Sequence, residues 1–126
     1  MEKILHQNEL LGVHIKGMHD GSTPISDAGE PLQLLTLKHS KGAQIKPHTH
    51  RSTERVTTHL QECLVVVKGV LQITLYGTET KPVKEVTVHA GEAFIFVSGG
   101  HSVTFLEDAE VFEIKNGPFK DDRVSL

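Results

Sequence analysis

Apolar and polar residues alternate over short stretches of the chain, most clearly in its second half. Over residues 70–76 every second side chain is a leucine or isoleucine, and this period of two is typical of a strand with one buried face. The preceding residues 63–67 are continuously apolar, and Lys68-Gly69 between the two runs favours a turn. We therefore predict a β-hairpin over residues 63–76.

Similar patterns predict strands on both sides of this hairpin. We expect them over residues 10–18, 32–39, 43–50, 83–89, 92–97, 102–106 and 110–115, with an arm or short edge strand over 1–9. Residues 19–31 are dense in turn formers and are predicted to be a loop, and the polar residues 51–61 a long loop or irregular strand. No window of a dozen residues has helical spacing. Short strands at even spacing predict an all-β fold, either a sandwich or a barrel.

Length and composition favour one globular domain over residues 1–126. The chain is 37% hydrophobic and 23% charged, as in ordinary globular proteins. Its formal net charge of −3 creates no basic field, which disfavours nucleic acid and acidic membrane surfaces as partners. The single cysteine cannot form an intrachain disulfide, and we find no signal peptide and no apolar run of membrane-spanning length. These features predict a cytoplasmic protein.

Histidines provide the candidate chemistry, because nine of them occur in 126 residues. His48 and His50 are two residues apart on a predicted strand, so they point to the same side and can share one metal ion. The alternative for such a pair is a solvated strand face. Glu62 favours the metal, because it begins the apolar run 63–67 and a buried carboxylate needs a compensating cation.

His101 is the third candidate ligand. It follows a Ser-Gly-Gly turn and shares strand parity with Val103 and Phe105, although a solvent-exposed turn histidine is the alternative. Three histidines and one carboxylate suit Fe, Mn, Ni, Co or Zn rather than Ca or Mg. Four protein ligands on a six-coordinate metal leave two positions open for a substrate or water.

Other residues with reactive side chains are interpreted more simply. The remaining histidines lack this context and are taken as surface or incidental residues, although His59 lies only three residues before Glu62; they are His6, His14, His19, His39, His59 and His89. Alternation places Cys63 on the face opposite Glu62, which predicts a buried and unreactive thiol.

The spacing of these residues resembles that of the cupin family. The first cupin motif is Gly, five residues, His-X-His, three or four residues, Glu, six residues, Gly, and Gly42, His48 and His50 match its first half. Two glutamates compete for the second half. Glu54 has the short gap after the histidines, whereas Glu62 has a glycine, Gly69, at the right distance. Glu62 is preferred, and Glu54 stays open as the alternative.

The second cupin motif is Gly, five residues, Pro-X-Gly, two residues, His. Gly91, Gly99 and His101 match it, with Val97 in place of the proline, one residue fewer before the histidine and no asparagine after it. The chain is also similar to small bacterial cupins that carry Gln-Glu before an apolar strand, Gly-Gly-His later, and an ending like Glu-Ile-Lys-Asn-Gly-Pro-Phe at 113–119.

The resemblance implies a cupin-type jelly-roll β-barrel. Residues 32–126 would form the barrel, and residues 1–31 would contribute an N-terminal arm, an edge strand and a loop. A divalent transition metal would lie in the barrel mouth on His48, His50, Glu62 and His101, and the protein would be a homodimer.

Three functions are compatible with this resemblance. The first is a metal-dependent oxygenase or isomerase of a small polar metabolite or sugar. The second is a non-catalytic module that binds or senses a small molecule. The third resembles metal-free sugar isomerases, in which barrel histidines carry out acid–base chemistry themselves. Cupins host many unrelated activities, so the fold does not choose among them.

Overall fold

The structure is a computed structural model that describes residues 1–77 and 80–126, and these two ranges hold ten β-strands and no helix. The strands are β1 (Glu2–His6), β2 (Glu9–Ile15), β3 (Gly21–Pro24), β4 (Leu35–Lys38), β5 (Glu62–Lys68), β6 (Val70–Tyr76), β7 (Pro82–His89), β8 (Ala93–Phe96), β9 (Gly100–Phe105) and β10 (Glu110–Lys115). All strand pairs are antiparallel. The predicted all-β class is confirmed. Within the same ranges, no helix is long and apolar enough to cross a membrane.

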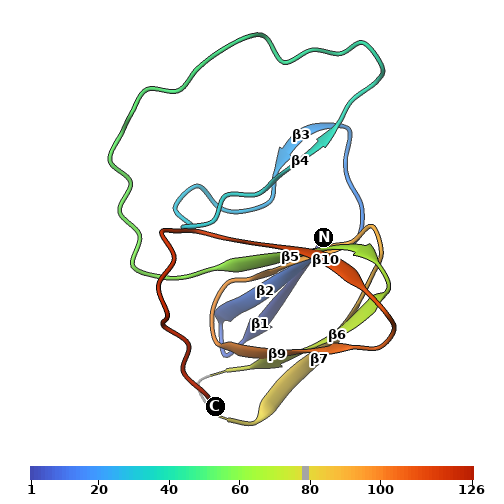
Figure 1. The fold of residues 1–126 in the computed structure, drawn as a ribbon, viewed down its shortest axis with the longest axis vertical. Coiled ribbons are helices and arrows are strands. Elements are labelled where there is room, and N and C mark those ends of the chain that lie inside the picture. The colour runs from blue at the N-terminus through green and yellow to red at the C-terminus, as the bar shows by residue number, and fades with distance from the viewer. Residues whose placement is uncertain (78–79) are drawn as a thin grey trace.

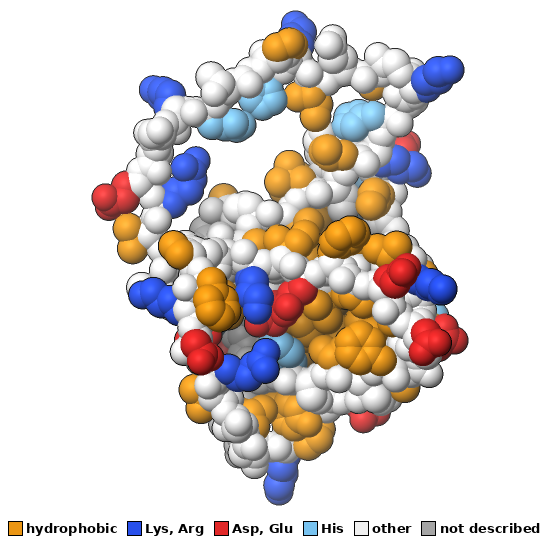
Figure 2. All heavy atoms as spheres, in the orientation of Figure 1, with side chains coloured by type: hydrophobic (Ala, Val, Ile, Leu, Met, Phe, Trp, Pro, Cys, Tyr) orange, Lys and Arg blue, Asp and Glu red, His pale blue; other side chains and the backbone are white. Residues whose placement is uncertain are grey.

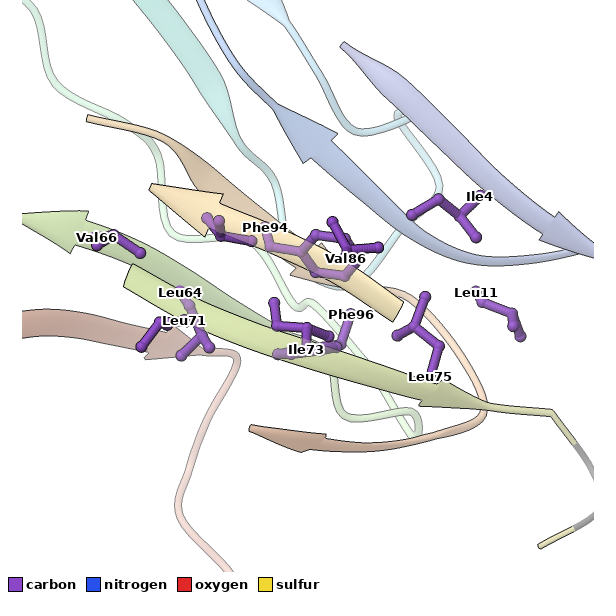
Figure 3. Close-up of a cluster of buried hydrophobic side chains, with 11 residues drawn as sticks. Ile4, Leu11, Leu64, Val66, Leu71, Ile73, Leu75, Val86, Phe94 and Phe96 are labelled. Atoms are coloured by element: carbon purple, nitrogen blue, oxygen red, sulfur yellow. The ribbon is translucent and has the colours of Figure 1, made fainter. Parts of the chain in front are cut away.

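Two sheets face each other around the main core. One has the strand order β1-β2-β8-β5-β10 and the other β7-β6-β9 (Figure 1). Eleven buried apolar side chains from both sheets fill the space between them, with Phe94 of β8 and Ile73 of β6 fully buried (Figure 3). In the described part of the chain neither sheet closes into a barrel, because β9 pairs only with β6 and β10 only with β5.

The segment between β3 and β4 packs on the outer face of the five-stranded sheet. Its Ile25, Leu32 and Leu34 belong to a second apolar cluster with Cys63 and other residues of that sheet, whereas β3 and β4 pair with each other. This explains the continuous apolar run after Glu62. Side chains of β5 are buried alternately in the main core and in the second cluster, so both faces of the strand must be apolar.

The predicted hairpin over residues 63–76 is wrong, although both of its strands form. β5 pairs with β8 and β10, whereas β6 pairs with β7 and β9. The turn at Gly69 therefore carries the chain from one sheet to the facing one. Gly69 has a φ of 87°, and an added Cβ would collide with the backbone oxygen of Asp108. An apolar run, a turn and an alternating run look the same in sequence whether the two strands pair or face each other.

Most other predicted strands are confirmed with shifted ends. Residues 1–9 contain the edge strand β1, the range 10–18 contains most of β2, and the last four predicted ranges coincide with β7 to β10 to within about three residues. The range 32–39 is strand only over Leu35–Lys38. Its partner β3 lies inside the stretch 19–31 that was predicted to be a loop.

The strand predicted over residues 43–50 is not formed. These residues belong to a segment without regular structure, residues 39–61, which we call the histidine loop and which arches away from the sheets between β4 and β5 (Figure 1). Alternation makes a strand only where a neighbouring edge can pair with its backbone. In the described part of the chain, residues 43–50 pair with no strand of the three sheets, so their alternation alone does not make a strand.

Candidate functional site

Glu62 and His101 meet at the end of the main core. Glu62 is the first residue of β5 and His101 the second of β9, so they come from facing sheets. The Nε2 atom of His101 lies 3.2 Å from Oε2 of Glu62. The side chains are only 28% and 17% exposed. The core therefore ends in a half-buried pair of ionisable groups, 39 positions apart in the chain.

Packing holds the imidazole of His101 in place. Its ring stacks on that of Phe96 with a centroid distance of 3.8 Å and an interplanar angle of 14°. Phe96 is a buried residue of β8 and shares its inward face with Phe94, so the aromatic ring that orients His101 is itself fixed by the core. One face of the imidazole is thus shielded, while Nε2 is directed at the carboxylate.

A lysine lies on the other side of the carboxylate. Lys115 of β10 is the direct strand partner of Glu62, and its Nζ atom is 3.9 Å from Oε1 of Glu62 and 3.6 Å from Oε1 of Glu113. These distances exceed hydrogen-bond range, so the contribution is electrostatic. Sequence reasoning missed both Lys115 and Phe96. The sequence did contain a signal for Lys115. Val111, Glu113 and Lys115 are alternate residues of one strand, so their side chains point to the same side, and Val111 packs against the core.

The predicted ligands His48 and His50 lie elsewhere, on the exposed histidine loop. Their rings are 5.1 Å apart and nearly perpendicular, at 77°. The Nδ1 atom of His48 donates a hydrogen bond to the backbone oxygen of Lys46 over 2.8 Å, which leaves Nε2 free. Histidine and basic side chains are spread along the arch of the loop, away from the sheets (Figure 2).

The four predicted ligands therefore occur as two separate pairs. His48 lies beside His50, and Glu62 beside His101. Within residues 1–77 and 80–126, no group of three or more histidine, cysteine, aspartate or glutamate side chains is arranged to hold a metal ion. Of the two competing glutamates, Glu62 is the one in contact with a predicted histidine ligand, and Glu54 is an exposed residue of the histidine loop.

The returning end of the histidine loop is anchored just before Glu62. Gln61 is 1% exposed, and its amide nitrogen donates to Oε2 of Glu30 over 2.6 Å while its amide oxygen accepts from the backbone of Leu32 over 3.2 Å. Its backbone nitrogen donates to Oδ1 of Asn116 over 2.8 Å. His59, predicted to be a surface or incidental residue, contacts the backbone oxygen of Val97 through Nε2 at 2.6 Å. These bonds fix the point at which Glu62 enters the core.

The interpretation of His14 as a surface or incidental residue is wrong. His14 is 2% exposed, and its Nε2 atom lies 2.9 Å from Oε1 of Glu92. The same oxygen accepts a hydrogen bond from the backbone nitrogen of His89 over 3.0 Å. Desolvation raises the pKa of Glu92, but these hydrogen bonds and the charges of the two histidines outweigh it, so the pKa of Glu92 lies below its ordinary value. In the sequence, His14 occupies one of the positions of its strand that alternate with apolar residues, which predicts an exposed side chain. The strand is buried on both faces, and alternation alone does not reveal this.

Cys63 behaves as predicted. Its side chain is 1% exposed in the second apolar cluster, on the face opposite Glu62, and burial raises the pKa of the thiol to about 11. The thiol therefore stays protonated at neutral pH and is a poor nucleophile.

Comparison of the chain with protein-family models, with curated proteins and with solved structures found no match. The cupin resemblance accordingly rests on the motif residues alone.

The chemistry available at the site follows from its groups. Glu62 and His101 can exchange a proton directly, because a carboxylate oxygen and an imidazole nitrogen face each other across a short distance. The same two atoms are donors that a borderline divalent metal accepts, and so is the free Nε2 of His48. The donor types fit a transition metal, whereas the four positions do not converge on one point in this conformation.

Proposed function

We propose that this chain is a small cupin-type protein that binds a divalent transition metal, Fe, Mn, Ni, Co or Zn, at the end of its core and a small polar molecule beside it. His48, His50, Glu62 and His101 would be the ligands, and residues 43–50 would complete a jelly-roll barrel. The contact between Glu62 and His101 carries the proposal, because a carboxylate and an imidazole from facing sheets meet at the open end of an apolar core.

Two further observations support the donor set. The Nδ1–H of His48 is already bonded to a backbone carbonyl, an arrangement that favours Nε2 as the metal-binding atom. His48 and His50 also lie close enough to reach one ion after small ring rotations. A bound metal would act as a Lewis acid on the small molecule. Lys115 would place a positive charge near that molecule, and Phe96 would keep the imidazole of His101 in position.

Metal analysis of the purified protein tests the proposal. After loading with Mn, Ni, Co or Zn, we expect elemental analysis to find about one ion per chain. Isothermal titration should show the same metal affinity in Glu54→Gln and an affinity at least about tenfold lower in Glu62→Gln. Retention in Glu62→Gln with loss in Glu54→Gln would show that the ligand set is wrong. Failure of the unaltered protein to bind any of these metals would remove the metal from the proposal.

A metal-free acid–base enzyme is the second candidate, and the direct His101–Glu62 contact favours it. The carboxylate would hold the imidazole in one tautomer while His101 moves a proton to or from a substrate. This candidate predicts that His101→Ala abolishes turnover of a candidate sugar while chelators have no effect. A protein that binds a small molecule without turning it over would instead be the non-catalytic module. A cytoplasmic location is part of the proposal and is supported by the single, buried cysteine.

A further inference from the structure

Lys115 lies between two carboxylates at the border of the candidate site. Its Nζ atom is 3.9 Å from Oε1 of Glu62 and 3.6 Å from Oε1 of Glu113, and both distances exceed hydrogen-bond range. Glu113 is two residues before Lys115 on β10, so the two side chains point to the same side of the strand. The ammonium group therefore has two alternative partners at similar distances and is tightly bound to neither.

The two oxygens of Glu62 face different partners. Oε2 lies 3.2 Å from Nε2 of His101, whereas Oε1 faces the ammonium group of Lys115. The side chain of Glu62 is 17% exposed and that of Lys115 is 35% exposed. A carboxylate that has lost most of its hydration needs a compensating positive charge. Lys115 supplies that charge in the metal-free protein.

The charges around Lys115 do not balance. Glu62 and Glu113 contribute two negative charges and Lys115 one positive charge, so the three side chains together carry one excess negative charge. An excess negative charge at a half-buried position attracts a further cation. A divalent ion that arrives at Glu62 repels the ammonium group, whereas Glu113 attracts it. The geometry thus offers Lys115 a second partner at the moment when it loses the first.

We infer that Lys115 is the counter-charge that occupies the cation position at Glu62 until a divalent ion displaces it, and that Glu113 then keeps the lysine beside the site. The lysine stem is flexible, so Nζ can shift from one carboxylate to the other without backbone movement. Lys115 is a positioning residue, because it acts on the ion through Glu62. The displacement rests on the proposed function, whereas the counter-charge role in the metal-free protein does not.

Unfolding of the metal-free protein tests the counter-charge role. Lys115→Met, Glu62→Gln and the double variant are compared with the unaltered protein in urea titrations that contain a chelator. We expect Lys115→Met to lower the folding equilibrium constant about two- to fivefold in the unaltered background, and to have little effect in the Glu62→Gln background.

Lys68→Met is the matched control for both experiments. Lys68 is an exposed residue that faces Glu110 across the same two strands, but it lies at the far end of β5, about 20 Å from Glu62. Its substitution removes the same charge from the same strand pair. It should change the folding equilibrium constant equally in the unaltered and Glu62→Gln backgrounds and leave metal affinity unaltered.

Isothermal titration with Ni²⁺ tests the displacement. It is run in about 0.5 M salt, where the Debye length falls to about 4 Å and distant charges are screened. We expect Lys115→Met to bind Ni²⁺ at least about threefold more tightly than the unaltered protein, because no ammonium group competes for Glu62. Glu113→Gln should bind Ni²⁺ at least about twofold more weakly, because Lys115 has lost its alternative partner.

The Lys115→Met/Glu113→Gln double variant separates displacement from a simple sum of charges. Since Glu113 acts on the ion through Lys115, the double variant should bind Ni²⁺ as tightly as Lys115→Met does. If the effects of the two single variants add instead, Lys115 and Glu113 act as independent charges, and the displacement is overturned.

The remaining outcomes distinguish this inference from the proposed function. Equal Ni²⁺ affinity in Lys115→Met and the unaltered protein overturns the displacement and leaves the metal site. A Lys115→Met effect that is the same with and without Glu62 overturns the counter-charge role. Coupling between Lys115 and Glu62 without Ni²⁺ binding by any of the proteins overturns the metal site and the displacement, and leaves the counter-charge role.

Discussion

The two halves of the candidate site differ in how the chain holds them. Glu62 and His101 belong to strands of facing sheets and are placed by the core behind them, with Phe96 stacked on the imidazole. His48 and His50 belong to the histidine loop, which is exposed along residues 39–60. The difference teaches that core packing fixes the positions of Glu62 and His101, whereas His48 and His50 lie on an exposed loop that no strand pairing fixes in the described part of the chain.

The largest effect should come from removing core support. Phe94→Ala leaves a cavity between the two facing sheets, where Phe94 is fully buried, and we expect the free energy of unfolding to fall by about 3–5 kcal/mol in urea titrations. Ile45→Ala on the histidine loop is the control, and it should change the free energy of unfolding by less than about 0.5 kcal/mol. A loss above ~1 kcal/mol for Ile45→Ala in monomeric protein would mean that the loop packs on its own chain.

A smaller effect is expected at the junction between the two halves. Gln61→Ala removes the buried amide that bonds Glu30 and Leu32, and we expect the free energy of unfolding to fall by about 1–3 kcal/mol because those partners lose their hydrogen bonds. Gln44→Ala, an exposed glutamine of the histidine loop, provides the matched control and should have little effect. Similar losses for the two variants in thermal unfolding would contradict the anchoring role of Gln61.

The smallest effect is expected at the pair of His14 and Glu92, which stabilises the sheets rather than the histidine loop. The folded-state pKa of Glu92 lies below the ordinary value of 4.5, so its ionised form stabilises the fold above pH 4.5, and this contribution is lost as the pH falls through the folded-state value. Glu92→Gln should reduce the free energy of unfolding by about 1 kcal/mol at pH 7 and by less at pH 3. Glu107→Gln at an exposed position is the control. A loss that grows on acidification would reverse the assigned sign.

Sequence patterns predicted individual strands better than they predicted strand partners. The alternation over residues 70–76 identified β6 correctly, yet the same pattern suggested a hairpin with β5 that the structure replaces with a crossing between sheets at Gly69. A local pattern reports which side of a strand is buried. It does not report which edge the strand pairs with, because pairing depends on residues far away in the chain.

The candidate site shows the same limit. The apolar run after Glu62 correctly predicted that this glutamate enters the interior, and parity correctly placed Cys63 on the opposite face. The position of His48 and His50 relative to Glu62 was not predictable, because alternation over residues 43–50 does not reveal whether a neighbouring strand pairs with them, and none does in the described part of the chain. His14 was misjudged because its strand is covered on both faces.

The sequence by itself determined the all-β class, the positions of most strands, the partial burial of Glu62 and the full burial of Cys63, because these depend on the local order of apolar and polar side chains. Only the tertiary structure decided that β5 and β6 lie in facing sheets, that Glu62 meets His101 across the core, and that the histidine loop pairs with neither sheet in the described part of the chain. Those outcomes depend on contacts between residues distant in sequence, whose free energy is set by packing of the whole core rather than by any one segment.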